Sequence, residues 1–200
     1  PNLSQVLGTI LIILLVIYLW KFKIEIKLNN KKMPGASFSQ PVKLFYSSTT
    51  PVIVMNTFIS NLYIFSQILY QKYPQNIIIK LLGTWADVGG EQVATGGLAY
   101  FLMPPKNFFS FITHPLKSIV YTLIILFASG FFTETMVNIT GKGASDMARG
   151  LKHEGFFIEG IKENEESIYK RLNRIIPTVS FLSGMLIAAL QILADLIGAI

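Results

Sequence analysis

The chain has 200 residues, of which 52% are hydrophobic and only 14% are charged, and its mean hydropathy is +0.52. Soluble domains carry about 25% charged residues, so the composition excludes an ordinary soluble domain, and the high hydrophobicity excludes a disordered chain. Seventeen basic and eleven acidic residues leave a net charge of +6, and the lack of cysteine excludes a disulfide framework and cysteine-based metal or redox sites. The sequence therefore predicts an all-α polytopic membrane protein.

Four apolar segments are long enough to cross a bilayer core, which takes about 20 residues. They are residues 3–20, 50–70, 117–135 and 175–195. The connections between them contain six, three and seven basic residues in turn, with Lys117 at the border of the third span. By the positive-inside rule, loops 21–48 and 136–174 face the cytosol, whereas loop 71–116 and the first residue lie on the opposite side.

The first cytosolic loop has the pattern of a small β-hairpin. Residues 21–28 alternate between polar and apolar side chains, which predicts a strand with one buried face. Asn29-Asn30 and Pro34-Gly35 are turn signals, and residues 37–46 can return as a second strand. A structured basic hairpin is more than a topology signal requires, so we favour docking to an acidic partner such as RNA or an acidic protein. Lysines that only hold the orientation are the alternative.

The second span carries an unusual stripe of polar side chains. They recur at spacings of four, three and four and therefore share one helical face. They are Asn56, Ser60, Tyr63 and Gln67. Ile53 lies in line with them one turn earlier, and Asn61 adds an amide on an adjoining flank. Polar groups in hydrocarbon need hydrogen-bond partners. The stripe therefore either forms hydrogen bonds that hold helices together or lines a contact between helices that opens onto a water-filled path. The pattern favours neither alternative.

The other two loops contain short predicted elements. In the second loop, the apolar stretch 77–85 predicts a short helix that lies at the membrane interface or re-enters the membrane. The glycine pairs at 89–90 and 96–97 predict turns. In the third loop, residues 144–152 predict a helix that Ser145 can cap.

The sequence contains no enzyme constellation. His114 and His153 lie on opposite sides of the membrane in this topology, so they cannot share a metal, and neither a nucleophile elbow nor a His-Glu-x-x-His motif occurs. We therefore expect no catalytic activity, no metal and no cofactor. Asp195, beside Gly198, is interpreted as marking a helix end rather than an ion site. Two classes remain, a channel or transporter and a membrane scaffold for partner binding.

Six short motifs occur in a fixed order along the chain. They are PVKLFY at 41–46, SNLY at 60–63, LGTW at 82–85, GGLAY at 96–100, LNRIIPT at 172–178 and ADLIGA at 194–199. In this order they resemble the SecY family, in particular the alpha subunit of the eukaryotic endoplasmic-reticulum protein translocon. The chain is then similar to spans six to nine of ten, which agrees with ends at Pro1 and Ile200 inside apolar segments. We therefore expect a fragment of the C-terminal half.

The resemblance implies a SecY-like inverted-repeat channel half. It implies a pore-forming subunit that translocates signal-bearing polypeptides across, and releases transmembrane segments into, the endoplasmic-reticulum membrane, with the first residue in the lumen. Ile53 is implied as a member of the apolar pore ring. The implied lateral-gate residues are Asn56, Ser60, Asn61, Tyr63 and Gln67. The implied partners are the beta and gamma translocon subunits, the ribosome, signal peptides and nascent chains, the lipid bilayer and post-translational translocation partners.

The resemblance also implies that both cytosolic loops dock the ribosome. The implied docking residues are Lys31, Lys32, Lys162, Lys170, Arg171 and Arg174. The family's hairpin tip reads Arg-x-Arg-Gly, whereas this chain has Lys32-Met33-Pro34-Gly35, and Lys162 stands where the family has arginine. Lysine keeps the charge but loses the bidentate fork for phosphate. A divergent translocon paralogue with altered ribosome docking and another polytopic secondary transporter are the alternatives.

Overall fold

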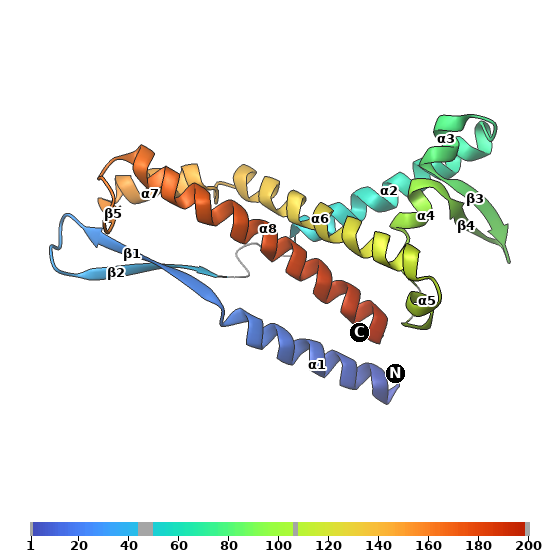
Figure 1. Cartoon of the computed structure of the whole chain (residues 1–200), viewed down its shortest axis with the longest axis horizontal. Helices are drawn as coiled ribbons and strands as arrows, with labels where there is room; N and C mark the ends of the chain where they lie inside the picture. The colour runs from blue at the N-terminus through green and yellow to red at the C-terminus, as the bar shows by residue number, and fades with distance from the viewer. Residues whose placement is uncertain (1, 44–49, 106–107, 199–200) are drawn as a thin grey trace.

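The computed structural model describes residues 2–43, 50–105 and 108–198. Four long helices run along the molecule: α1 (Leu3–Trp20), α2 (Thr50–Lys72), α6 (Pro115–Ile139) and α8 (Glu165–Ile197) (Figure 1). Each of them is long and apolar enough to cross a membrane. The predicted fold class, a helical polytopic membrane protein with four long apolar helices, is confirmed.

Helices α6 and α8 pack closely because small residues meet at their interface. A Cβ atom added at Gly184 of α8 would lie 2.5 Å from the carbonyl oxygen of Ser129 on α6. A Cβ atom added at Gly130 of α6 would lie 2.8 Å from the ring of Phe181. Thr133, on the same side of α6, is fully buried. Small residues let two backbones approach, which is a common basis of helix association in membranes.

Helices α2 and α1 attach to this pair in different ways. An apolar cluster joins α2 to α6 and to the C-terminal part of α8; its buried members are Val52, Met55, Tyr121, Ile125, Ala188 and Ile192. The hydroxyl of Ser129 also donates a hydrogen bond of 3.2 Å to the sulfur of Met55. Helix α1, in contrast, is exposed along most of its length, and its one buried residue, Gly8, lies against Ile197 of α8.

One end of the molecule, which we name the sheet end, is built around a three-stranded antiparallel sheet in the order β2-β1-β5. Strands β1 (Lys23–Asn30) and β2 (Ser37–Lys43) form the predicted hairpin, with Pro41 in the edge strand β2. Strand β5 (Phe156–Ile158) comes from the third loop, so the prediction of a two-stranded hairpin was incomplete. The remainder of the predicted second strand, residues 44–46, lies outside the described residues.

Helix α7 (Ala144–His153) and the first turns of α8 complete the sheet end. The prediction that Ser145 caps α7 was wrong: Gly143 is the N-cap residue, where a Cβ would lie only 2.7 Å from Asn138 Oδ1. Helix α8 begins at Glu165, ten residues before the predicted span. This extension is stable because Ile168 and Leu172 are buried in the core of the sheet end.

The opposite end, which we name the hairpin end, consists of five short elements in place of the predicted loop. They are α3 (Ile77–Leu82), β3 (Thr84–Val88), β4 (Glu91–Gly96), α4 (Gly97–Leu102) and α5 (Phe108–Thr113). The predicted helix therefore stops at Leu82, and Trp85 lies in a strand. Gly89 and Gly90 form the turn of the β3–β4 hairpin with φ values of 66° and 88°, so the turn predicted there is confirmed. The turn predicted at 96–97 was wrong, because Gly96 ends β4 and Gly97 begins α4.

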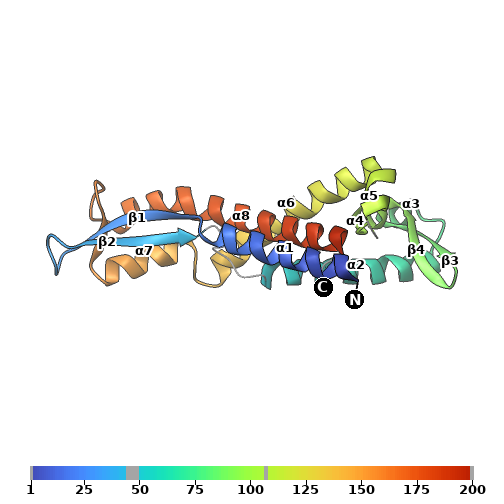
Figure 2. The same cartoon turned by 90° about the horizontal axis from the view of Figure 1, so that it is seen from below.

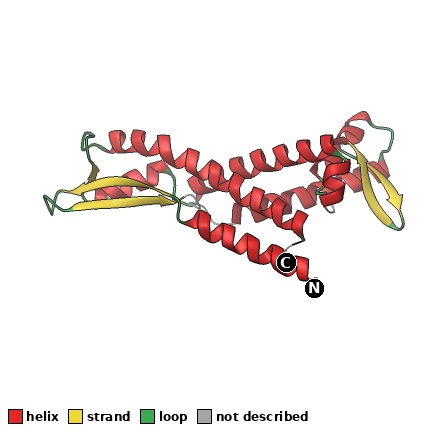
Figure 3. Ribbon diagram, turned by 60° about the horizontal axis from the view of Figure 1, so that its bottom comes forward, coloured by secondary structure: helices red, strands yellow, loops and turns green. Residues whose placement is uncertain are grey.

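The long helices separate these two ends. Figure 2 shows β1, β2 and α7 at one extreme of the long axis and α3, β3 and β4 at the other. Figure 3 shows the same division by secondary structure, because the strands occur only near the two extremes and helices fill the middle. This arrangement places two separate structured surfaces on opposite sides of a helical layer.

Candidate functional site

The polar stripe of α2 lies at the border between the packed and the exposed face of the helix. Successive residues of an α-helix are about 100° apart. Asn56 and Tyr63 therefore project beside the buried Val52, whereas Ile53 and Ser60 project further round the helix. The stripe therefore has a packed side, with Asn56 and Tyr63, and an open side, with Ile53 and Ser60.

On the packed side, Asn56 and Tyr63 reach neighbouring elements. Asn56 Nδ2 donates a hydrogen bond of 3.2 Å to Oε1 of Gln191 on α8. The Tyr63 hydroxyl donates a hydrogen bond to the carbonyl oxygen of Leu102, the last residue of α4. These two residues therefore form hydrogen bonds between helices, the first of the two alternatives, in this structure. Neither Gln191 nor Leu102 was singled out from the sequence.

On the open side, the remaining predicted residues stay accessible. Asn61 and Ser60 are exposed, and Gln67 is half-buried. The Ser60 hydroxyl donates a hydrogen bond of 3.0 Å to the carbonyl oxygen of Asn56 in its own helix. This bond does not tie Ser60 to another element. Ile53, the predicted pore-ring residue, is 59% exposed. This side of α2 thus presents amide and hydroxyl groups next to an apolar side chain.

Ser66 fixes α2 to the hairpin end, although the sequence pattern gave no indication of it. It is fully buried and accepts a hydrogen bond of 2.9 Å from Nε1 of Trp85. The ring of Tyr63 packs edge-on against Trp85, with ring centroids 6.2 Å apart. A Cβ at Gly83 would lie 2.5 Å from Ser66 Oγ, so only glycine lets the chain pass here. The LGTW motif drew attention to Trp85, but it could not identify Ser66 as the partner of that side chain.

At the sheet end, two of the predicted docking lysines form ion pairs with acids of the chain. Lys31 Nζ, at the tip of the β1–β2 hairpin, lies 2.5 Å from Oε2 of Glu163 in the segment before α8. Lys170 Nζ lies 2.8 Å from Oε1 of Glu166, one turn earlier in α8. Exposed pairs of this kind contribute little to stability, but each reduces the positive charge that a polyanion meets.

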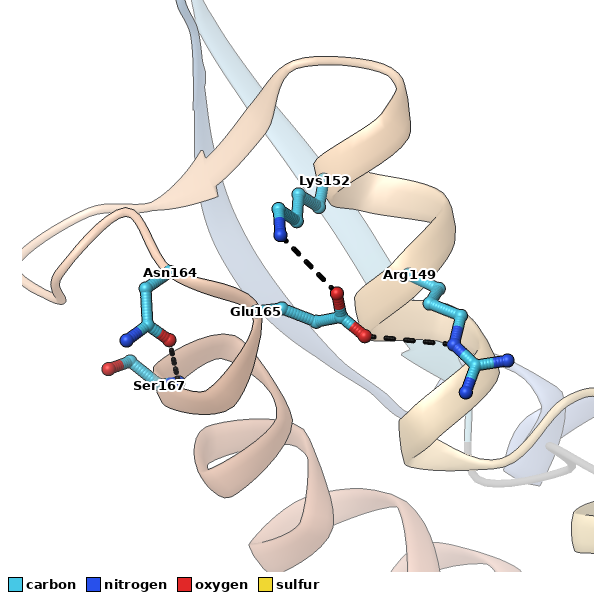
Figure 4. A network of polar contacts seen from close by, with 5 residues as sticks. All are labelled: Arg149, Lys152, Asn164, Glu165 and Ser167. Carbon is cyan, nitrogen blue, oxygen red and sulfur yellow. Dashed lines mark hydrogen bonds and ion pairs between the residues drawn. The ribbon is translucent and has the colours of Figure 1, made fainter.

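A second set of ion pairs joins α7 to the start of α8 (Figure 4). The Glu165 carboxylate lies 3.6 Å from Arg149 Nε and 3.4 Å from Lys152 Nζ. Just before it, Asn164 caps α8 by accepting a hydrogen bond of 3.0 Å from the backbone N–H of Ser167. The acidic residues Glu163 and Glu165 therefore connect the β1–β2 hairpin, α7 and the start of α8.

The other four predicted docking residues are solvent-exposed. They are Lys32, Lys162, Arg171 and Arg174. Within the part of the chain that the structure describes, none of these four takes part in an ion pair. Lys32 lies in the turn between β1 and β2 and Lys162 in the segment before α8, whereas Arg171 and Arg174 lie in the first three turns of α8.

The two histidines are far apart. His114 precedes α6, next to α5 of the hairpin end, and His153 is the last residue of α7 at the sheet end. Among the described residues, no group of three or more His, Asp or Glu side chains is placed to hold a metal ion. Asp195 lies in the last turn of α8, and Gly198 caps this helix with a left-handed conformation, φ 74°. The prediction that Asp195 lies near a helix end is confirmed.

Comparison of the sequence with known proteins gives matches along the whole chain. The SecY family model matches residues 1–200. The chain is 37% identical over 203 residues to the protein transport protein SEC61 subunit alpha of Candida glabrata. It is 38% identical over 203 residues to the protein transport protein SEC61 of Saccharomyces cerevisiae. Each alignment covers 100% of this chain and 42% of the relative, so the chain spans less than half the length of these relatives.

Solved structures agree with the sequence matches. A structure described as that of a protein conducting channel has a TM-score of 0.76 and 30% identity, covering 100% of this chain and 45% of that one. The idle yeast Ssh1 complex bound to the yeast 80S ribosome has a TM-score of 0.65 and 25% identity, covering 98% of this chain and 40% of that one. The predicted resemblance is confirmed in sequence and in fold: the chain belongs to the SecY family.

Proposed function

We propose that the chain is part of the pore-forming alpha subunit of a protein-conducting channel in the endoplasmic-reticulum membrane. Such a channel translocates signal-bearing polypeptides and releases transmembrane segments into the bilayer. The observation that carries this proposal is the open side of α2. Amide and hydroxyl groups stay accessible on a span that is otherwise apolar, in a chain that matches the SecY family over its whole length. A span that contacts only lipid does not need them.

In this proposal, α2 and α6 form one wall of a lateral gate, and Ile53 contributes to an apolar ring around the pore. Ser60, Asn61 and Gln67 face the passage, while the Asn56–Gln191 hydrogen bond holds α2 against α8. A signal helix competes for the open side of α2 and shifts the population from the closed to the open state. The driving force comes from a partner, so this chain needs no nucleotide.

The sheet end is proposed to face the cytosol and the hairpin end the lumen, with the first residue on the luminal side. Cationic side chains of the two proposed cytosolic loops then meet ribosomal RNA and proteins. The proposed partners also include the beta and gamma subunits, nascent chains, the bilayer and post-translational translocation factors. The family match and the distribution of the basic residues support this orientation.

Site-specific crosslinking tests the conducting role. A photoreactive amino acid is placed at Asn61 in the full-length protein with its partner subunits, and a stalled nascent chain with a signal sequence is presented. We expect capture of the nascent chain at Asn61. The control position is Leu14 of α1, a comparably exposed residue on a span without the stripe. Equal capture at both positions, or at neither, contradicts the proposal.

A specific observation favours a variant of this function in which ribosome docking is weakened. Lys31 and Lys170 are already paired with Glu163 and Glu166, which lowers the charge that RNA meets. We therefore propose a translocon paralogue in which the docking residues outside these ion pairs, Lys32, Lys162, Arg171 and Arg174, carry most of the docking. Combined Lys32→Glu and Lys162→Glu should lower ribosome co-sedimentation, whereas Lys80→Glu at the hairpin end should not. Unchanged co-sedimentation in the double variant contradicts the docking role.

A further inference from the structure

A cavity of about 230 Å³ lies at the hairpin end, where no predicted site residue is found. Strand β4 and the end of α4 form one wall, and α5 and the first two turns of α6 form the other. Apolar lining is provided by side chains such as Val93, Met103 and Pro105. The cavity is therefore made by packing between the β3–β4 hairpin region and one end of a long apolar helix.

The polar groups in the cavity wall are suited to an anion. Lys117 and His114 are among the lining residues, and no carboxylate is found among the described residues that line it. The Lys117 ammonium lies 4.4 Å from the centroid of the Tyr100 ring, and this cation–π contact holds it at the wall. Tyr121, a buried residue of α6, is also among the lining residues, and its hydroxyl is a hydrogen-bond donor.

The surface next to the cavity is apolar. Helix α5 and the start of α6 expose large hydrophobic side chains, each at least 57% accessible: Phe108, Phe109, Ile112, Leu116 and Ile119. They belong to the same two elements that form one cavity wall. A basic group beside such a surface, at the end of a helix long enough to span a bilayer, is expected at the level of the lipid headgroups.

We propose that this cavity binds the anionic headgroup of a membrane lipid, whose acyl chains lie along the exposed side chains of α5 and α6. The lipid phosphate pairs with Lys117, and the Tyr121 hydroxyl donates to a headgroup oxygen. The size favours a single headgroup, and the apolar walls favour an amphiphile over a small soluble anion. The proposal requires only that α6 crosses the membrane, so it can fail without the failure of the channel function.

Lipid photolabelling tests the proposal on the full-length protein with its partner subunits. The complex is reconstituted in phosphatidylcholine nanodiscs that contain a trace of photoactivatable phosphatidylserine or photoactivatable phosphatidylcholine. Labelled peptides are mapped by mass spectrometry. We expect the phosphatidylserine probe to label residues 108–121 about fivefold more than the phosphatidylcholine probe, the preference that one lysine near anionic lipid provides. Lys117→Gln should abolish this preference.

Two further variants make the outcome specific. Lys80→Gln changes an exposed lysine of α3 that does not line the cavity and should keep the preference. Val93→Trp fills the cavity from β4 and should strongly reduce labelling of 108–121 by both probes, with thermal unfolding to verify the fold.

Equal labelling by both probes, or a preference that survives Lys117→Gln, overturns the proposal. Competition by excess water-soluble glycerophosphoserine also overturns it, because the site then takes soluble anions. No labelling of 108–121 in the unmodified protein overturns it as well, since another segment then fills the cavity.

Discussion

Trp85 Nε1 donates a hydrogen bond of 2.9 Å to Ser66 Oγ, and this bond joins a strand of the hairpin end to the interior of α2. Both residues are buried, and Tyr63 packs against the same indole ring. The gate wall that we propose for α2 is therefore anchored at one end by a polar contact that water cannot easily replace. The strength of this anchor is measurable.

Ser66→Ala should destabilise the hairpin end. The substitution leaves the buried Trp85 N–H without its acceptor, which costs about 1–3 kcal/mol. Hydrogen exchange of the β3 and β4 amides in the reconstituted complex measures the loss. Ser60→Ala on the same helix is the matched control, since the Ser60 hydroxyl bonds only to its own helix, and its effect should stay within about 0.5 kcal/mol. Equal effects of the two variants would argue against the anchor.

Gly184→Ala should loosen the contact between α6 and α8. The added methyl group would lie 2.5 Å from the Ser129 carbonyl oxygen, backbone that cannot move aside, and such overpacking costs about 1–3 kcal/mol. Thermal unfolding of the reconstituted complex provides the measurement. Gly150→Ala, in α7, is the control because nothing lies within 4 Å of its added Cβ, so it should be neutral or stabilising. A neutral Gly184→Ala would contradict the close packing.

The Asn56–Gln191 hydrogen bond should show coupling in a double-mutant cycle. Asn56→Leu, Gln191→Leu and the double variant should give a coupling energy of about 0.6–1.7 kcal/mol, the range for bonds between membrane helices. If this bond helps to keep the gate closed, each single variant should also translocate a reporter with a weakly hydrophobic signal more efficiently. Thr57→Val, which affects a bond within α2 only, should do neither. Additive single effects would exclude the coupling.

Glu163→Gln should strengthen ribosome binding. Removal of this carboxylate releases Lys31 from its ion pair and makes one more cation available to phosphate. The plot of log binding constant against log salt concentration should become steeper by about 0.7–0.9, the increment for one phosphate contact. Glu159→Gln removes an exposed acid from the same loop that takes part in no ion pair within the described residues, and its slope should not change. An unchanged slope for Glu163→Gln would show that the ion pair with Glu163 does not keep Lys31 from contacting ribosomal phosphate.

Much of the fold follows from the sequence because its signals are local. Hydropathy over about 20 residues predicts the four long helices, and two-residue alternation predicts β1. The glycine pair at 89–90 predicts the turn of the β3–β4 hairpin. These signals need no knowledge of distant partners.

The features that escaped prediction depend on distant partners. Strand β5 has three residues and pairs with Asn30, Asn29 and Leu28 far earlier in the chain. The start of α8 is helical because Ile168 and Leu172 are buried against other elements, not because of its charged sequence. In the same way, periodicity placed Asn56 and Tyr63 on one face but could not identify Gln191 or Leu102 as their partners.

Strand β5 also has a mechanical consequence. It makes the two proposed cytosolic loops a single body, since β1 follows α1 and β5 lies between α7 and α8. A load applied at the tip of the β1–β2 hairpin cannot displace the tip alone, because the sheet and the Lys31–Glu163 pair transmit it to the start of α8. Helix α8 has 33 residues and is about 50 Å long. It therefore joins the core of the sheet end to the cluster that packs α2, α6 and α8 in one continuous element.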